Sequence, residues 1–306
     1  MIESSVVFID SGIGGLPYLD WLRKRRPELP LYYFADTAHF PYGDLGVRVI
    51  RDSVVEAVRF LQGLGTPRLI VIACNTASVL ALDDIRKVAI CPVVGTVPAL
   101  KPALGWQGPI GVLATAGTVQ SPYLDNLVST FASGREIVKV AAGDIVNYVE
   151  ENWFSEEQDG ALTVIEPAIE KLKESRVGSV VIGCTHFFYV IQSIRMLMGE
   201  GVPIVDSLDG VGRRILSLLD LEDSRSRVGK KGSNGGSRKG GANARDNSNS
   251  TALPGSGGFM VSRGGIRDNR YQSFAQVRGL TWIGEIPRGG NGRNIASPVY
   301  RPCIDD

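Results

Sequence analysis

Short apolar runs alternate with amphipathic segments of helical length through most of this chain, and this rhythm constrains the fold most. The apolar runs include VVFID, LYYFA, RLIVIA and PVVGT, and the segments between them predict helices over 16–25, 47–64 and 78–89. Strands separated by helices in this way are typical of parallel βαβ units. We therefore predict an α/β protein with parallel sheets.

A second series of the same kind begins at Pro109. It runs through IGVLATAGT, EIVKVAAGD, a charged segment that ends near Glu174, SVVIGCTH and PIVDS. Each series opens with a strand that enters a Gly-rich or Gly/Thr turn, and each later has a strand that ends at a cysteine. All α/β sheets share some of this pattern, but the common order favours duplication. We expect two pseudo-symmetric α/β domains.

The segment from Glu222 to Gly258 differs from the rest of the chain. It has no aromatic residues, nine glycines, and seven Lys or Arg against three acids. Such a segment cannot bury enough apolar area to offset the entropy of ordering it. We expect a disordered Gly/Ser/Arg-rich insertion, and its dispersed charges are typical of a solvated loop rather than a nucleic-acid site.

After this insertion, GFMVS and RYQSFAQVRGLTWIG predict a last strand and helix, so the chain returns to a folded domain. The residues from Pro287 onward resemble a disordered tail.

Bulk composition argues against several classes of protein. A chain of 306 residues with 43% hydrophobic and 21% charged content can bury a real core. The net charge of +1 gives no reason to expect a nucleic-acid partner, and no apolar run approaches the roughly 18 residues of a membrane span. The N-terminus MIESSVVFIDSG carries an acid where a secretory signal needs a basic start. We expect a cytoplasmic protein with no membrane partner.

The four cysteines, at positions 74, 91, 184 and 303, lack the paired spacing of zinc sites or disulfide frameworks. In a reducing compartment they should be free thiols. A buried cysteine is often only a small hydrophobic residue, and Cys91 in AICPVV suits that description. Cys74 and Cys184 suit it less, because polar residues follow each of them directly, Asn75-Thr76 and Thr185-His186.

Two thiols at the carboxyl ends of parallel strands would face a crevice where ligands bind. A redox couple is disfavoured because the cysteines come from distant strands without Cys-x-x-Cys spacing. A metal site is disfavoured because only His39 and His186 could add imidazole ligands, so we predict no metal. As acid and base the pair is complete, since a thiolate can remove a proton from one face of a carbon while a thiol supplies one to the other. That arrangement inverts a stereocentre.

Such a site needs groups that adjust the thiols, because a free thiol is only a few per cent ionised at neutral pH. His186 lies two residues beyond Cys184, and Asp10 is its counterpart at the end of VVFID. The turn DSGIGGL after this strand fails the dinucleotide pattern, because Pro17 replaces the third glycine. Its backbone N–H groups could instead hold a carboxylate.

Several motifs together resemble those of the glutamate racemases. They occur in order as FIDSGIGGL, ADTAHFPYG, ACNTAS, PVVGTVPA, ATAGTVQSPY, GCTHF and VDS, and the late FMVS strand and RYQSFAQVRGL helix are also similar to that family. The two cysteine motifs alone indicate only the wider aspartate/glutamate racemase superfamily. DSGIGG and PYG favour the glutamate branch.

The resemblance implies an enzyme without cofactors that interconverts L- and D-glutamate by a two-base mechanism, with D-glutamate used for bacterial peptidoglycan. It implies catalytic roles for Cys74, Cys184, Asp10 and His186. The residues implied to bind the substrate are Asp10, Ser11, Tyr42, Gly43, Asn75, Thr76, Thr185 and His186.

The family fold implies an active site in the cleft between two domains, the first completed by the C-terminal segment. The expected organisation is a first domain of residues 1–95, 209–221 and 259–286, a second domain of 96–208, the insertion at 222–258 and the tail at 287–306. A homodimer is compatible with this organisation.

The chain departs from the family pattern at Phe188, where a proline is common, and we expect this to alter the loop beside Cys184. His39 lies at a variable position and receives no role. Two alternatives stay open at this point. One is an aspartate racemase or a related isomerase that uses the thiol pair on a small carbon acid, and the other is an inactive protein that binds an amino acid for regulation.

Overall fold

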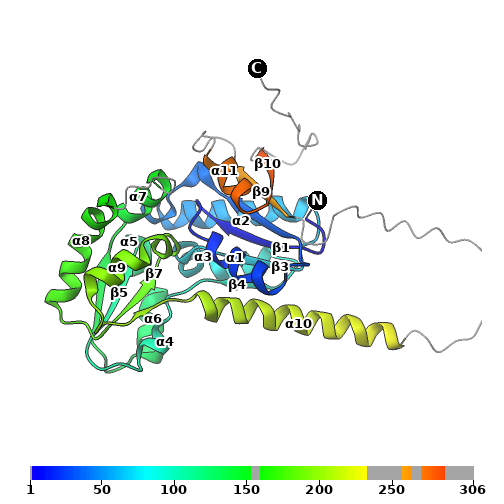
Figure 1. Cartoon of the computed structure of the whole chain (residues 1–306). Coiled ribbons are helices and arrows are strands. Elements are labelled where there is room, and N and C mark those ends of the chain that lie inside the picture. Colours follow the sequence, from blue (N-terminus) through cyan, green and yellow to red (C-terminus); the bar gives the residue numbers. More distant parts are fainter. Residues whose placement is uncertain (1, 153–158, 233–256, 263–269, 287–306) are drawn as a thin grey trace, which may run out of the picture.

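The computed structural model describes residues 2–152, 159–232, 257–262 and 270–286, which form two lobes (Figure 1). The first lobe contains a six-stranded sheet in the order β10-β9-β2-β1-β3-β4, and the second a four-stranded sheet in the order β6-β5-β7-β8. All paired strands are parallel. The predicted α/β class with parallel sheets is confirmed.

The first lobe is built from both ends of the described chain. Its strands are β1 (Val6–Asp10), β2 (Leu31–Ala35), β3 (Leu69–Ile72), β4 (Val93–Gly95), β9 (Gly258–Ser262) and β10 (Thr281–Ile286). Its helices are α1 (Leu16–Arg25), α2 (Val47–Gly63), α3 (Asn75–Val88), α10 (Leu208–Gly232) and α11 (Arg270–Val277), with short 3-10 turns η1 (Thr37–His39) and η2 (Tyr42–Asp44).

The second lobe uses the middle of the chain. Its strands are β5 (Ile110–Ala114), β6 (Ile137–Ala141), β7 (Ser179–Gly183) and β8 (Ile204–Val205). Its helices are α4 (Leu100–Ala103), α5 (Ala116–Val119), α6 (Pro122–Phe131), α7 (Asp144–Asn152), α8 (Asp159–Glu174) and α9 (Ile191–Met198), together with the 3-10 turn η3 (Thr185–Val190).

The two sheets share a four-strand unit. In the first lobe the order is β2-β1-β3-β4, and in the second it is β6-β5-β7-β8. The opening strand of each lobe therefore pairs with the next strand on one side and with the strand before the cysteine on the other. The expected pseudo-symmetry is confirmed by this topology.

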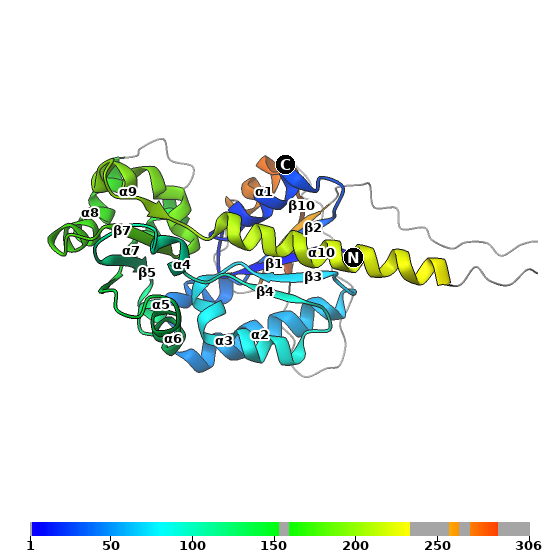
Figure 2. The same cartoon turned by 90° about the horizontal axis from the view of Figure 1, so that it is seen from below.

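The centre of the first sheet is covered on both faces, which explains why its central strands are largely apolar. All five residues of β1 are buried. Val6 and Phe8 face the core that includes α1 and α10, while Val7 and Ile9 face the core that includes α2 and α3. Figure 2 shows α1 and α10 on one side of the sheet and α2 and α3 on the other.

The chain passes from the second lobe back to the first at the start of α10, and contacts with α1 hold this connection in place. The hydroxyls of Tyr18 and Ser207 lie 2.7 Å apart, and Trp21 Nε1 donates to Asp209 at 2.6 Å. A Cβ on Gly212 would lie 2.5 Å from the Trp21 ring, so glycine is required for this close approach. The two lobes are thus joined by a packed crossing.

The expected disordered insertion from Glu222 needs correction at its beginning, because α10 continues to Gly232. The helix is anchored there by Arg68, whose guanidinium donates to Glu222 at 2.7 Å and to Asp223 at 2.5 Å. These ion pairs supply what the apolar content of the segment lacks. The rest of the predicted insertion and the predicted tail, 233–256 and 287–306, lie outside the described residues.

A second difference concerns TWIGEI, which the sequence interpretation placed with a final helix. It forms strand β10, which pairs with β9 at the edge of the first sheet. Within the described ranges, no helix combines the length and apolar character that crossing a membrane requires.

Candidate active site

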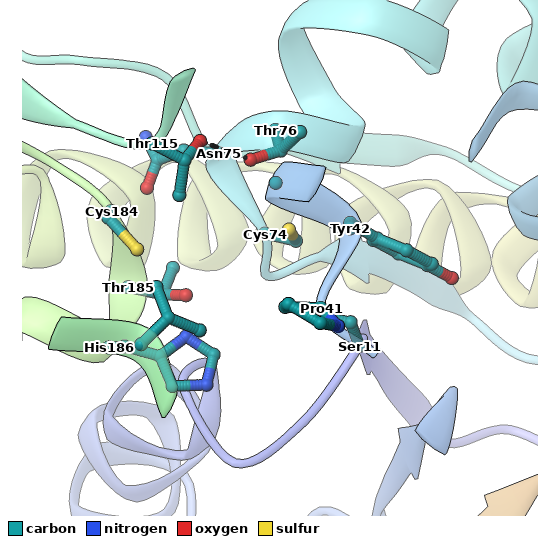
Figure 3. Close-up of a pocket in the computed structure, with 12 residues that line it drawn as sticks. Ser11, Pro41, Tyr42, Cys74, Asn75, Thr76, Thr115, Cys184, Thr185 and His186 are labelled. Atoms are coloured by element: carbon teal, nitrogen blue, oxygen red, sulfur yellow. Dashed lines mark hydrogen bonds between the residues drawn. The ribbon is translucent and has the colours of Figure 1, made fainter. Parts of the chain in front are cut away.

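Cys74 and Cys184 occupy equivalent places in the two lobes. Each follows a buried strand and immediately precedes a helical segment, α3 for Cys74 and η3 for Cys184. Their backbones are nearly the same, with φ/ψ of −135°/123° at Cys74 and −143°/134° at Cys184. Both are free thiols, as is Cys91. Figure 3 shows Cys74 and Cys184 on opposite sides of a pocket between the lobes.

The space between the pocket walls is about 250 Å³, including its opening to solvent. Its lining residues are Ser11, Pro41, Tyr42, Gly43, Cys74, Asn75, Thr76, Thr115, Val146, Cys184, Thr185 and His186.

The pocket brings together all the predicted site residues except Asp10. This carboxyl is fully buried behind the pocket wall, where it accepts a hydrogen bond from Ser11 N at 2.6 Å and one from Thr185 Oγ1 at 3.2 Å. It also lies within hydrogen-bond reach of the Cys74 thiol. Asp10 is not among the lining residues, and its direct binding of substrate stays a prediction.

Burial dominates the electrostatics on the Cys74 side. It raises the pKa of Asp10 from 3.8 to about 6, although the charge of His186 and the bond from Ser11 oppose the shift. Burial, with the nearby charge of Asp10, also raises the pKa of Cys74 well above its usual value. Burial therefore favours the protonated, neutral form of the Cys74 thiol.

The Cys184 side carries a cation instead. Burial would lower the pKa of His186, but hydrogen bonds with Cys184 and Glu150 outweigh it and raise the pKa from 6.5 to about 10. His186 Nε2 lies 3.0 Å from Glu150 Oε1, and both side chains are only 3% exposed. His186 thus links the Cys184 thiol to the Glu150 carboxylate.

The turn between β1 and α1 is shaped by this second side of the site. Ile13 N donates to Glu150 Oε1 at 2.6 Å. The turn therefore binds a carboxylate, as expected from its free N–H groups, but this carboxylate is a side chain of the protein. A Cβ on Gly14 would lie 2.5 Å from both His186 Nδ1 and Thr185 Oγ1. The glycine-rich sequence therefore lets the first lobe approach the catalytic groups of the second.

The remaining pocket wall offers polar groups to a ligand. Asn75 is 3% exposed, and its Nδ2 has no hydrogen-bond partner among the described residues. Thr76 Oγ1 lies 2.9 Å from Thr115 Oγ1, which joins the two lobes at this wall. A buried donor without a partner costs free energy that a bound carboxylate would recover.

Tyr42 contributes to the pocket by its ring rather than its hydroxyl. That hydroxyl donates to Asp36 Oδ2 at 2.6 Å, and Figure 3 shows it on the side away from Cys184. His39 Nδ1 lies 3.2 Å from the same carboxylate and does not line the pocket. Phe188, the departure from the family pattern, packs edge-on against Tyr18 with ring centroids 5.5 Å apart.

Sequence reasoning missed four residues of the site: Glu150, Pro41, Thr115 and Val146. Pro41 stands inside the quoted motif ADTAHFPYG. Thr115 follows β5 as Ser11 follows β1, so the internal repeat could have identified it. No such signal marks Glu150, which stands beside Glu151 on an amphipathic helix and differs from it only by being buried.

Comparisons with known proteins agree with this geometry. A family model of Asp/Glu/Hydantoin racemases matches residues 19–210. Glutamate racemase of Sphingopyxis alaskensis is 38% identical over 224 residues, which cover 71% of this chain and 83% of the relative. Glutamate racemase of Treponema pallidum is 37% identical over 213 residues, 69% of this chain and 80% of the relative.

Solved structures show the same architecture. The crystal structure of Escherichia coli glutamate racemase with L-glutamate and the activator UDP-MurNAc-ala has a TM-score of 0.75 at 28% identity, and the match covers 94% of this chain and all of that one. The Francisella tularensis glutamate racemase with D-glutamate, at 22% identity and a TM-score of 0.69, shares the fold and covers 90% of this chain and 94% of its own. The chain therefore belongs to the Asp/Glu/hydantoin racemase family and, within it, to the glutamate racemases.

Proposed function

We propose that this protein interconverts L- and D-glutamate, with Cys74 and Cys184 exchanging the α-proton from opposite faces. The observation that carries the proposal is the placement of two free thiols, at equivalent positions of two lobes, on opposite sides of one small pocket. Removal of a proton on one face and delivery on the other inverts the α-carbon.

The choice of glutamate is supported by the relatives. The E. coli enzyme was crystallised with L-glutamate and the F. tularensis enzyme with D-glutamate. In this protein, the unpartnered amide of Asn75 and the hydroxyls of Thr76 and Thr115 line the same pocket as the thiols. These donors suit the carboxylates of an acidic amino acid.

Each turnover removes one proton from the α-carbon and delivers another to it. One sulfur, as thiolate, takes the α-proton and becomes a thiol, while the electron pair passes into the substrate carboxylate. The other sulfur gives its proton to the opposite face and becomes a thiolate, so one turnover exchanges the protonation states of Cys74 and Cys184. Asp10 beside Cys74 and His186 beside Cys184 are the groups through which those states are reset.

The difficult part of the reaction is charge, because an α-proton is far less acidic than a thiol. The substrate carboxylate becomes more electron-rich as the proton leaves. A preorganised donor in a site closed from water can lower such a barrier by about 3 kcal/mol. Asn75 and Thr76 are buried donors on the pocket wall and are suited to this task.

Circular dichroism of L-glutamate incubated with the pure protein, without added cofactor, tests the proposal directly. The signal should decay to zero as the racemic mixture forms, and in deuterated water deuterium should appear at the α-carbon. An unchanged signal, with no isotope exchange, would leave an inactive amino-acid-binding protein. Competition kinetics with aspartate separate this enzyme from an aspartate racemase.

The biological setting is also part of the proposal. We infer that D-glutamate made here supplies peptidoglycan synthesis, that the protein is cytoplasmic, and that nucleic acids and membranes are not its partners. A homodimer stays a prediction, which sedimentation of the purified protein with and without glutamate would check.

A further inference from the structure

The first two residues of helix α11 reach from the first lobe to the active-site carboxylate of the second. Tyr271 donates its hydroxyl to Glu150 Oε2 at 3.2 Å. Arg270 donates through one guanidinium nitrogen to the backbone oxygens of Glu150, at 3.0 Å, and Glu151, at 3.2 Å. Contacts from a distant part of the chain therefore converge on the residue that pairs with His186.

The position of the Tyr271 hydroxyl is fixed by packing in the first lobe. The side chain is 2% exposed, and its ring lies 6.2 Å from Phe259 of β9 and 6.1 Å from Phe274 of α11, measured between centroids. Such aromatic contacts restrict the ring to one orientation. The hydroxyl is thus a donor held ready for a carboxylate on the other lobe.

Glu150 depends on donors from three separate segments. Its Oε1 receives Ile13 N from the β1–α1 turn and contacts His186 after β7, while its Oε2 receives Tyr271. A buried carboxylate needs such donors to stay ionised. Without Tyr271, Oε2 of Glu150 would lose this donor, and the carboxylate that contacts His186 would be held less firmly.

Arg270 acts on the same helix end. Glu150 and Glu151 stand near the end of the described part of α7. The Arg270 guanidinium donates to the backbone carbonyls of both residues. It therefore fixes the backbone from which the Glu150 side chain projects.

We propose that Tyr271 and Arg270 are positioning residues for the racemase reaction, which act through Glu150 on His186 and hence on the Cys184 half of the site. This inference rests on the proposed function. The segment after residue 256 then supports the active site as well as completing the first sheet. Turnover therefore depends on the contact between the two lobes.

A double-mutant cycle tests the inference. Tyr271→Phe keeps the ring and removes only the hydroxyl, and we expect kcat to fall roughly tenfold with a smaller change in KM. In a Glu150→Gln background, the same substitution should lower kcat less than about twofold, because its target is already altered. Ser5→Ala is the control, since it removes a buried hydroxyl that donates to the Ile2 carbonyl at the amino end of β1, away from the pocket.

The control should change kcat little, and by the same factor in both backgrounds. Full activity of Tyr271→Phe, or an equal fall in both backgrounds, would overturn the inference. If Tyr271→Phe does not fold, Arg270→Gln provides the same cycle with the same expectation. Wild-type protein that does not racemise glutamate would instead refute the proposed function, so the two failures are distinguishable.

Discussion

The two halves of the active site share a backbone frame but differ in charge. Cys74 and Cys184 follow equivalent strands with nearly equal dihedral angles. Beside Cys74 stands Asp10, an acid whose pKa is raised to about 6 by burial, and beside Cys184 stands His186, a base whose pKa is raised to about 10. Duplication of a fold thus sets where the thiols lie, and their neighbours set what each side does.

This difference has a chemical reason. Inversion of the α-carbon requires one proton acceptor and one proton donor at the same time. Two sides with identical neighbours would not distinguish the acceptor from the donor. The acid beside Cys74 and the base beside Cys184 give the two sides different surroundings. The substitutions below are ordered by the size of the effect expected on this asymmetric pair.

Removal of either thiol should have the largest effect. We expect Cys74→Ala and Cys184→Ala each to lower racemisation by about 10²- to 10⁴-fold, because each removes one of two obligatory proton carriers. Optical rotation of glutamate measures the loss, and Cys91→Ala is the control, since that thiol lies outside the pocket. Undiminished turnover in either pocket variant would remove the two-base mechanism.

Substitution of the neighbours should expose the asymmetry itself. We expect Asp10→Asn and His186→Asn each to lower kcat roughly 10- to 100-fold. Because each neighbour serves a different thiol, the primary deuterium isotope effect should rise for opposite enantiomers in the two variants. Rates with α-deuterated L- and D-glutamate measure it. Equal isotope effects for both enantiomers in both variants would show that the two sides are not separable.

The close approach of the glycine turn gives a prediction about stability. Gly14→Ala places a methyl group against Thr185 and His186, and we expect a loss of about 1 to 3 kcal/mol in unfolding free energy. Gly46→Ala is the matched control, because nothing lies within 4 Å of a Cβ there. Urea denaturation compares the two, and equal stabilities would show that the turn can move away from the second lobe.

The pH dependence of stability should distinguish the two sides most finely. Both folded pKa values lie above their reference values, so each group stabilises the fold below its reference pKa and loses that contribution as the pH rises through its folded pKa. The window is 3.8 to about 6 for Asp10 and 6.5 to about 10 for His186. The slope from one group is at most about 1.4 kcal/mol per pH unit.

Asp10→Asn should flatten the lower part of the profile, and His186→Gln the upper part. Thermal unfolding across pH 4 to 10 reads both windows in one series. If both variants reduce the pH dependence of stability over the same pH range, Asp10 and His186 titrate as one coupled unit. The two sides would then not differ in this respect.

Much of the architecture could be predicted from sequence because it follows from periodicity. The helix predicted over 16–25 is α1 as observed, and the alternation of strands and helices was sufficient for two parallel sheets. The thiol positions could be predicted because parallel strands deliver their carboxyl ends to one edge. Short-range sequence patterns determine these features, so the sequence alone is sufficient to predict them.

Features that depend on contacts between distant segments could not be predicted in this way. Glu150 looks like any helical glutamate, and its role appears only when Ile13, His186 and Tyr271 converge on it. Asp10 was correctly associated with Cys74, but its exclusion from the pocket wall follows from its bonds with Ser11 and Thr185. The beginning of the predicted insertion was wrong because Arg68 anchors it from another element.

The position of β9 in the sheet has a consequence for synthesis. Both thiols, His186 and Glu150 emerge from the ribosome long before β9, yet β2 has its outer edge unpaired until β9 arrives beside it. A nascent or prematurely terminated chain would therefore display an open sheet edge and lack the last donor to Glu150.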